Sequence, residues 1–461
     1  MAKASPAKKE EQKQQEESGK KVNVHYLTRV EGHGNIVVEI QADGTVTKCS
    51  WEVPEAPRFF EAMVLGRDYR DVHHITSRIC GICSIGHQIA SLQGTEDALN
   101  IRVSDQSVVL RKLALHAENL QSHLLHIVYL VLPDLMGVDS IIPLAQTNKE
   151  DVLKLIEARK ISNEFSRIIC GRTTHPQRMT PGGWVKLPTN AELKELRAML
   201  KKSLTNLDFL VDVYASLEDK VPQFERETEY ISLVSPAEYA LYWGEIGSTQ
   251  DSRHPARHYK NITREYCVPQ STAKWAKNKG KSFMVGALAR YNLNEDKLSA
   301  GARKAAQKLN LKPMCTNPFM NTHAQIVECV HTVEDSIKLI DSILKKGIKQ
   351  ETLPEITARA GRGTGAVEVP RGILYHSYEY DDNGRVFAAD CVIPTNQNHA
   401  NIQLDMEALV PTLTGKSEAE IELILSMLVR AYDPCISCST HVINLYDRSP
   451  EGKFVQFHYK D

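Results

Sequence analysis

Two short segments near opposite ends of the chain each place two cysteines at C-x-x-C spacing. The first is SRICGIC, which contains Cys80 and Cys83, and the second is DPCISC, which contains Cys435 and Cys438. Four thiolates at this spacing can close a tetrahedral site, so the pattern is compatible with a structural zinc site. Thiolates also bind other soft or borderline metals such as nickel, iron and copper. On spacing alone, a structural site and a redox-active site both remain open.

The surroundings of the two pairs favour a metal site that combines redox and proton chemistry. Structural zinc sites are typical of small modules, whereas here the whole fold must close to bring the pairs together. Imidazole and carboxylate groups lie close to the cysteines in the sequence, at His87, Asp433 and His441. A thioredoxin-like dithiol is disfavoured, because that motif belongs to a βαβ unit.

Composition excludes several classes of protein. The 461 residues are 42% hydrophobic and 25% charged, which is typical of a globular protein with a large core. A formal net charge of −1 argues against a nucleic-acid surface. Ten cysteines are too few for a secreted disulfide scaffold of this length. We find neither an apolar signal segment nor an apolar run long enough to span a membrane, so we expect a cytoplasmic protein.

Local patterns predict several long helices. One begins at Ser104 and runs to about Leu132, and an amphipathic helix ends at Gly347. A short helix, a loop and a second helix are expected around the first cysteine pair. Capping boxes, in which Ser or Thr is followed three residues later by Glu, predict two more helix starts. These pairs are Thr189 with Glu192 and Ser417 with Glu420, and the last helix leads directly into the second cysteine pair.

Strands are predicted at the beginning of the chain and near its end. Residues 22–53 alternate in polarity around a turn at 42–44, and residues 365–395 form strands around a turn at 383–384. No elements are assigned between 229 and 293. The prediction is a mainly α protein with small β-sheets (α+β), in which a long buried helix bundle holds the metal site at its centre. Residues 1–21 are expected to be a disordered tail, and 22–441 a single domain.

The cysteine motifs resemble those of a known family. R-x-C-G-x-C followed by a histidine, and D-P-C-x-x-C-x-x-H, are similar to the two signatures of the large, catalytic subunit of nickel–iron hydrogenases. Four further stretches match that family in the same order, and the resemblance covers the chain from about Val22 to His441. These stretches are RVEGHG (29–34), APRFFE (56–61), HPQRMTPGG (175–183) and EVPRG (368–372).

The resemblance implies a binuclear centre and a reaction. Cys80 and Cys435 would be terminal ligands of nickel, while Cys83 and Cys438 would also bridge to iron. The iron would carry one carbon monoxide and two cyanides. The reaction would be reversible, heterolytic cleavage of H₂ into protons and electrons. The stretch that reaches an iron-bound cyanide would consist of Ile393, Pro394 and Thr395.

The resemblance also implies roles for groups around the centre. Glu31 would pass protons from a terminal thiolate, although outside its motif it would be read as a surface carboxylate. His87 would donate a hydrogen bond to a bridging sulfur. Arg371 would lie above the centre, paired with Asp134 and Asp433.

A second, hard-cation site follows from the same resemblance. Glu61, His441 and the backbone carbonyl near Cys391 would bind magnesium, for which oxygen ligands are suitable. For Glu61, a helix-surface carboxylate is the alternative interpretation.

The resemblance finally implies partners and processing. The chain has no further cysteine cluster for iron–sulfur centres, so electrons would leave through an iron–sulfur small subunit and further electron-carrier subunits. Maturation proteins would supply the centre, and a maturation protease would remove residues 442–461. Two alternatives stay open beside the zinc site: a hydrogen sensor with the same centre, and a structural subunit related to respiratory complex I. The latter predicts loss of the two cysteine pairs, but all four cysteines are present.

Overall fold

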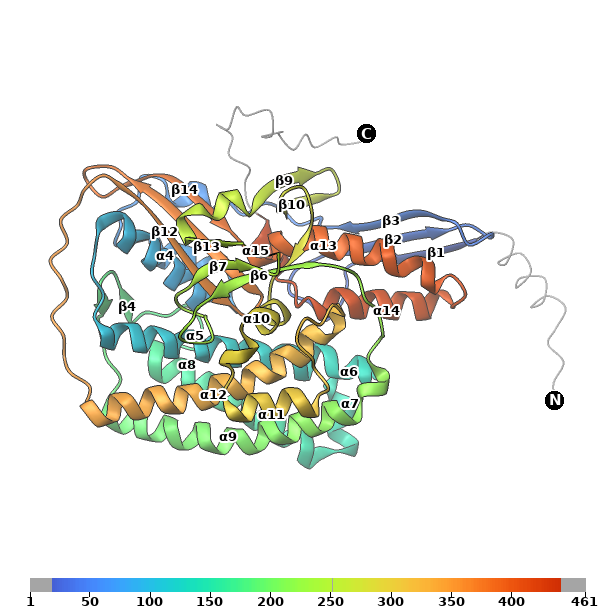
Figure 1. Cartoon of the computed structure of the whole chain (residues 1–461), viewed down its shortest axis with the longest axis horizontal. Helices are drawn as coiled ribbons and strands as arrows, with labels where there is room; N and C mark the ends of the chain where they lie inside the picture. Colours follow the sequence, from blue (N-terminus) through green and yellow to red (C-terminus); the bar gives the residue numbers. More distant parts are fainter. Residues whose placement is uncertain (1–18, 251, 441–461) are drawn as a thin grey trace.

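The structure, a computed structural model, describes residues 19–250 and 252–440. Most of the long helices lie together on one side, and several small sheets lie on the other, where three further long helices pack against the strands (Figure 1). The predicted class, mainly α with small β-sheets, is therefore confirmed. The long helices are α4 (Ser84–Leu99), α5 (Asp105–Leu125), α8 (Lys149–Cys170), α9 (Asn190–Ser216), α12 (Asn321–Lys346), α13 (Pro394–Leu409) and α14 (Glu418–Ala431).

The N-terminal sheet is antiparallel, in the order β1-β2-β3, and its predicted hairpin is confirmed. Gly44 closes the turn with a φ of 86°, which favours glycine. The first strand begins at Lys20, so the last two residues of the predicted tail belong to the sheet instead. Residues 1–18 lie outside the described part. The strands are β1 (Lys20–Val24), β2 (Asn35–Ile40) and β3 (Val46–Glu52).

The predicted helix starts are confirmed. The Ser104 hydroxyl accepts the Ser107 N–H at the start of α5. Both capping boxes form, at the starts of α9 and α14. The helical segment that starts after Ser104 extends past Leu132, as expected. It is not a single α-helix, because α5 ends at Leu125 and a π-helical segment, His126–Val131, leads into α6.

The predicted amphipathic helix and the remaining short helices complete the helical part of the fold. α12 ends before Gly347 as predicted, but it begins earlier than its amphipathic half suggested, because its first turns are buried. None of the described helices combines the length and the apolar character needed to cross a bilayer. The shorter helices are α2 (Phe60–Val64), α3 (Val72–Thr76), α6 (Leu132–Leu135), α7 (Ile141–Thr147), α10 (Ala287–Asn294), α11 (Ala300–Lys308) and α15 (Ile436–Ser439).

The segment without predicted elements contains most of the short strands. β6 is buried along its whole length, so it shows no alternation of polar and apolar residues. Several of its neighbours have only two residues. The strands are β6 (Glu229–Val234), β7 (Glu245–Ser248), β8 (Arg253–His254), β9 (Arg264–Val268), β10 (Ser271–Lys277) and β11 (Phe283–Met284), and β4 (Met179–Thr180) pairs with β5 (Gly183–Trp184) outside this segment.

The late sheet has the predicted antiparallel strands, in the order β12-β13-β14. Helix α4 lies directly on β12, because alternate residues of that strand are glycines. A Cβ atom on Gly365 would lie 2.0 Å from the Ala90 carbonyl oxygen of α4. The helix that follows the first cysteine pair is thereby seated on the strand that leads toward Arg371. The strands are β12 (Gly361–Val369), β13 (Gly372–Tyr380) and β14 (Val386–Val392).

Gly365→Ala is expected to destabilise the protein by about 3 kcal/mol, since a rigid backbone contact must move to admit the methyl group. Thermal unfolding of the variant would measure the loss. The matched control is Gly415→Ala, because a Cβ there meets no atom within 4 Å. Equal melting temperatures for the two variants would contradict this account of the helix–strand contact.

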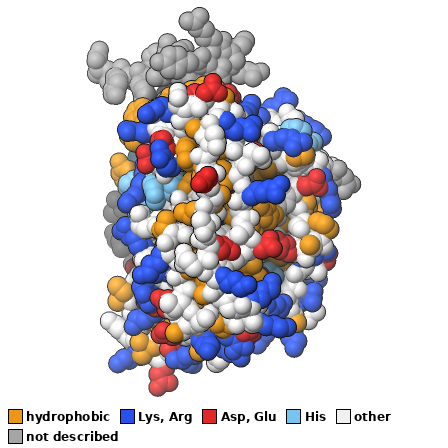
Figure 2. Space-filling model, turned by 90° about the vertical axis from the view of Figure 1, so that its left-hand side faces the viewer, with side chains coloured by type: hydrophobic (Ala, Val, Ile, Leu, Met, Phe, Trp, Pro, Cys, Tyr) orange, Lys and Arg blue, Asp and Glu red, His pale blue; other side chains and the backbone are white. Residues whose placement is uncertain are grey.

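The surface of one side of the molecule is mixed in charge. Lysine and arginine side chains surround this face, acidic side chains lie among them, and apolar side chains show between them near its middle (Figure 2). The main hydrophobic core extends across both helices and sheets and includes the four motif cysteines.

Candidate metal centre

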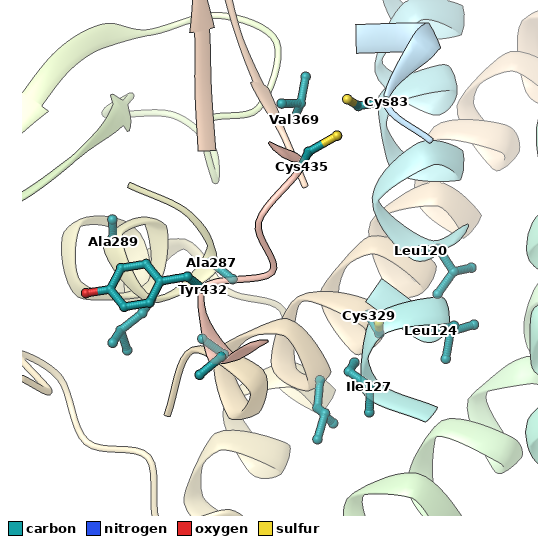
Figure 3. Packing of buried hydrophobic residues seen from close by; sticks show 14 of the residues in the cluster. Cys83, Leu120, Leu124, Ile127, Ala287, Ala289, Cys329, Val369, Tyr432 and Cys435 are labelled. Atoms are coloured by element: carbon teal, nitrogen blue, oxygen red, sulfur yellow. The ribbon is translucent and has the colours of Figure 1, made fainter. Parts of the chain in front are cut away.

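The two cysteine pairs meet inside the protein. All four side chains are buried, and their sulfurs lie within 4.8 Å of one another. The sulfurs of Cys80 and Cys435 are 3.5 Å apart. Figure 3 shows the sulfurs of Cys83 and Cys435 directed toward the same space, beside Val369 of β12. The donors therefore converge although they come from opposite ends of the chain.

Local structure explains how each pair is presented. Cys83 is the residue immediately before α4, and Cys438 lies within the short helix α15. Arg58 joins the two segments: its guanidinium donates to the carbonyls of Ile79, at 2.7 Å, and Ser437, at 3.4 Å. Arg58 belongs to the APRFFE stretch, but the sequence did not single it out.

The donor set fits a cation of soft character. Burial opposes ionisation of Cys80, but hydrogen bonds from the other three thiols outweigh it and hold the pKa of Cys80 below its usual range. Hydrogen-bonding contacts with the other three cysteines raise the pKa of Cys435, and burial raises it further. Four thiolates this close together repel one another unless a positive ion lies between them. Soft metals such as nickel and iron match sulfur ligands of this kind.

Glu31 lies beside the second pair. Its carbonyl accepts the Ile436 N–H at 3.0 Å, in an isolated bridge that aligns Glu31 with Cys435. The carboxylate accepts the N–H of Ser437 at 3.2 Å and also a short hydrogen bond from its hydroxyl. Burial raises the pKa of Glu31, with a further contribution from the charge of Cys80. The group is thus suited to hold a proton close to the sulfurs.

Arg371 is buried in the turn between β12 and β13. Its Nη2 donates to the Asp433 carboxylate at 2.7 Å and its Nε to the Asp433 carbonyl at 3.0 Å. The pKa of Arg371 is raised: burial lowers it, but the charges of Asp433 and Cys435 outweigh that effect. The guanidinium therefore stays charged beside the cysteines.

The predicted pairing of Asp134 with Arg371 is wrong. Asp134 instead lies between Arg29 and Arg430 and accepts short hydrogen bonds from both. The third guanidinium nitrogen of Arg371, Nη1, donates to the Ser122 hydroxyl at 2.9 Å. Ser122 was not predicted from the sequence, because only the packing of α5 against the turn brings its hydroxyl close to Arg371.

His87 lies on the first turn of α4, fully buried. Its Nδ1 is 3.0 Å from Nε2 of His376, whose Nδ1 is 2.6 Å from the Tyr378 hydroxyl. Its Nε2 has no hydrogen-bond partner among the described residues. Burial lowers the pKa of His87 to about 4, against the opposing effect of the Cys80 charge. The imidazole is therefore neutral near pH 7 and has one ring nitrogen left to interact.

The predicted cyanide-binding stretch forms the start of α13. Ile393 precedes the helix, and Pro394 opens it, where a missing N–H costs nothing. The Thr395 hydroxyl accepts the Cys435 N–H at 3.0 Å. The stretch thereby contacts the second cysteine pair directly.

The predicted hard-cation ligands are partly described. Glu61 accepts the Cys391 N–H at 2.8 Å, so this carboxylate and that backbone lie together. Burial raises the pKa of Glu61 to about 7, although Lys274 lowers it. His441 lies outside the described residues, but the carbonyl of Thr440 accepts the Arg58 N–H at 2.7 Å, close in sequence to Glu61.

One further carboxylate near the centre was missed. Glu118 on α5 accepts the N–H groups of Ile85, at 2.7 Å, and Gly86, at 3.0 Å, at the first turn of α4. Burial raises its pKa to about 8, while these N–H groups lower it. Glu118 thereby anchors the helix that follows Cys83. No local motif marks it, because its partners lie far away in the sequence.

Comparison with known proteins agrees with these features. A sequence model of nickel-dependent hydrogenases matches residues 58–154 and 235–441, and a HoxL-like model matches 21–56. Sulfhydrogenase 1 subunit alpha of Pyrococcus furiosus is 31% identical over 92% of this chain and 98% of its own length. The NAD-reducing hydrogenase HoxS subunit beta of Cupriavidus necator is 26% identical over 92% and 95%, respectively.

Solved structures share the fold. The crystal structure of an NAD⁺-reducing NiFe hydrogenase in the H₂-reduced state has a TM-score of 0.80, with 26% identity over 92% of this chain and 100% of that chain. A NiFeSe hydrogenase of Dm. baculatum has a TM-score of 0.75 at 23% identity, over 92% and 100% of the two chains. The four converging thiols, the matched family model and the extent of the similarity lead to one conclusion: this chain belongs to the nickel-dependent hydrogenase family.

Proposed function

We propose that this chain is the catalytic large subunit of a nickel–iron hydrogenase, which cleaves H₂ reversibly and heterolytically into protons and electrons. One observation carries the proposal: four buried sulfurs from opposite ends of the chain converge within 4.8 Å, and a carboxylate and a guanidinium lie beside them. A structural zinc site needs the sulfurs, but it needs neither Glu31 nor Arg371.

The four cysteines would hold the metals. Cys80 and Cys435 would be terminal ligands of nickel, and Cys83 and Cys438 would also bind iron, which would carry one carbon monoxide and two cyanides. Such a centre supplies Lewis-acid polarisation of H₂ and the capacity to exchange two electrons. The soft character of thiolates supports nickel and iron over hard cations.

The protein's own groups would manage the proton and the surroundings of the centre. Glu31 would take the proton at its carboxylate and exchange it with the Ser437 hydroxyl, to which it is hydrogen-bonded. Neutral His87 would present its unpaired Nε2 to a sulfur and so tune the basicity of that sulfur. Thr395, which accepts the Cys435 N–H, would fix the position of this ligand together with Ile393 and Pro394.

Arg371→Lys is expected to lower turnover by about 10- to 100-fold while the metals and the fold are retained. A lysine keeps the charge, but it cannot donate to Asp433 and Ser122 from one planar fork. Turnover, metal content and melting temperature of the same preparations would be compared. Loss of the folded protein would show that Arg371 is structural rather than functional.

We further propose that Glu61, the Cys391 carbonyl and His441 bind magnesium. Burial raises the pKa of Glu61 to about 7, so below that pH a proton competes with the ion for the carboxylate. Affinity for Mg²⁺ is then expected to fall about tenfold for each pH unit below about 7. Magnesium content after equilibrium dialysis at several pH values would measure this. Glu61→Gln should make the pH dependence weaker, because only the His441 imidazole could then still exchange the metal for a proton. A pH dependence equal to that of the wild type would exclude Glu61 as a ligand.

The proposed organisation is a single domain over residues 22–441 and a C-terminal extension, 442–461, that a maturation protease removes. An iron–sulfur small subunit would take the electrons, since the relatives are named as alpha or beta subunits of hydrogenases. Maturation proteins would deliver the diatomic ligands. The similarity to an NAD-reducing enzyme supports a cytoplasmic location and further electron-carrier subunits, because NAD is a soluble intracellular carrier.

Elemental analysis of the purified native complex, with infrared spectra in the carbon monoxide and cyanide region, tests the proposal. Nickel and iron near one each per large subunit, with bands from one carbon monoxide and two cyanides, are expected. An intact-mass measurement of the same preparation shows whether residues 442–461 have been removed. Zinc alone in a chain that has lost its extension would refute the hydrogenase centre.

A further inference from the structure

The turn that carries Arg371 is held from outside its own hairpin. It joins β12 to β13 through Pro370 and Arg371, with Val369 paired to Gly372. The carbonyls of Val369 and Pro370 accept hydrogen bonds from the Arg290 guanidinium on α10, at 2.9 and 3.1 Å. The peptide groups immediately before Arg371 are therefore bound to a second arginine.

Two buried carboxylates fix the orientation of the Arg290 guanidinium. Its Nε and Nη2 donate to the two oxygens of Glu328 at 2.6 and 2.7 Å, and its Nη1 donates to Glu368 at 2.8 Å. With the two carbonyls, these bonds use all five N–H donors of the guanidinium. The side chain is fully buried. Lysine in its place would supply three donors from a single point and could not span this set.

The Glu328 carboxylate is also connected to the helix that contacts the guanidinium of Arg371. Glu328 accepts a hydrogen bond from Nε2 of His123 on α5 at 2.8 Å. The preceding residue, Ser122, contacts Nη1 of Arg371 at 2.9 Å. Arg290 and Glu328 together thus connect the turn that carries Arg371 to the helix that receives one of its donors.

Close packing leaves the turn little room to shift. A Cβ on Gly372, whose φ is +135°, would lie 2.5 Å from a methyl carbon of Val285 and 2.9 Å from the nitrogen of Gly286. The backbone N–H of Arg290 donates to the Gly286 carbonyl at 2.9 Å. The turn and the start of α10 are therefore in direct contact, and Arg290 lies one helical turn further along the same helix.

We propose that Arg290 is a positioning residue for the metal centre, which holds the Pro370-Arg371 turn and thereby sets the place of the Arg371 guanidinium beside the cysteines. This inference rests on the proposed role of Arg371. Arg290 itself touches neither the cysteines nor Asp433 in any hydrogen bond of the described residues; all five of its donors are used elsewhere.

The test compares Arg290→Lys with a matched control in the purified complex. Arg111 is also fully buried, and its guanidinium binds the two oxygens of Glu96 at 2.6 and 2.7 Å. Its hydrogen bonds do not include the turn. Arg111→Lys therefore reports the general cost of replacing a buried, paired arginine. Arg371→Lys shows how the cyanide infrared bands respond when the positive charge beside the centre is moved.

Two readouts distinguish positioning from stability. Amide deuterium exchange of the peptide that spans 366–375 is expected to be at least about tenfold faster in Arg290→Lys and unchanged in Arg111→Lys. The cyanide infrared bands are expected to shift in the same direction in Arg290→Lys and Arg371→Lys, at wild-type nickel and iron content, and not in Arg111→Lys. If Arg290→Lys does not fold, Glu328→Gln, which removes the charge that holds Arg290, is measured against the same criteria.

Wild-type exchange of the turn together with wild-type cyanide bands in these variants would overturn the proposal. The exchange measurement needs no metal. It therefore tests whether Arg290 restrains the turn even if the native complex lacks the nickel–iron centre. Absence of that centre would refute the proposed function, not the restraint of the turn by Arg290.

Discussion

Replacing Cys435 by alanine is expected to abolish nickel retention and hydrogenase activity. Its sulfur is buried 3.5 Å from that of Cys80, and its N–H donates to the Thr395 hydroxyl, so the side chain is fixed among the other sulfurs. Loss of groups that only orient ligands already costs up to about 100-fold in metal affinity, and loss of a ligand should cost more. Nickel content by elemental analysis and H₂ uptake of the same preparation would measure the effect.

Cys329→Ala provides the control for Cys435→Ala. Cys329 is equally buried, but it lies on α12 away from the two motif pairs, near Leu120, Leu124 and Ile127 (Figure 3). Its replacement should cost about 1 kcal/mol of stability and leave the nickel content unchanged. Wild-type H₂ uptake by Cys435→Ala, or equal nickel loss in both variants, would remove Cys435 from the ligand set.

Glu31→Gln is expected to lower turnover by about 100- to 10,000-fold, the range for removal of a positioned acid–base group. The amide keeps the size of the side chain but cannot take up a proton. The metals should be retained, because Glu31 contacts the cysteine segment through its backbone and through Ser437. The exchange of H₂ with deuterated solvent, measured beside metal content, isolates the proton step.

Glu55→Gln is the matched change for Glu31→Gln. Glu55 lies close to the same loop, where it accepts the His33 N–H at 2.8 Å, but within the described part of the chain no hydrogen bond joins it to the cysteine segments. Its replacement should leave the isotope exchange near the wild-type rate. If Glu31→Gln also exchanges at that rate, the proton leaves the centre by another route.

The metal ligands and the long helices were the most predictable features. Thiolate chemistry depends on residue type and spacing, and the two C-x-x-C pairs are explicit in the sequence. Helix starts were equally legible, because a capping box such as Thr189 with Glu192 is complete within four residues. In each case the signal and the structure that it specifies lie in the same short stretch.

The failures arose where a residue acts through distant partners. Asp134 was assigned to Arg371, but it binds Arg29 and Arg430, because the choice among buried arginines depends on how α6 meets the N-terminal loop and α14. Ser122 was missed for the same reason.

The short strands between 229 and 293 escaped prediction for a different reason. β6 is buried on both faces, so it lacks the alternation by which a half-exposed strand is recognised. Strands of two residues carry no pattern at all. Arg290, in α10 just after these strands, was also missed. Its partners are Glu328 on α12 and residues 368–370 at the end of β12, and these two segments meet Arg290 only in the folded chain.

The separation of the two cysteine pairs also determines when, during synthesis of the chain, all four metal ligands become available. Cys80 and Cys435 are 355 positions apart. A ribosome adds roughly 5–20 residues per second, so the first pair emerges roughly 20 to 70 seconds before the second exists. During that interval the chain contains only two of the four sulfurs that form the centre. Complete chelation is therefore confined to chains that have been synthesised through Cys438, and a chain that terminates before Cys435 lacks half of the ligands.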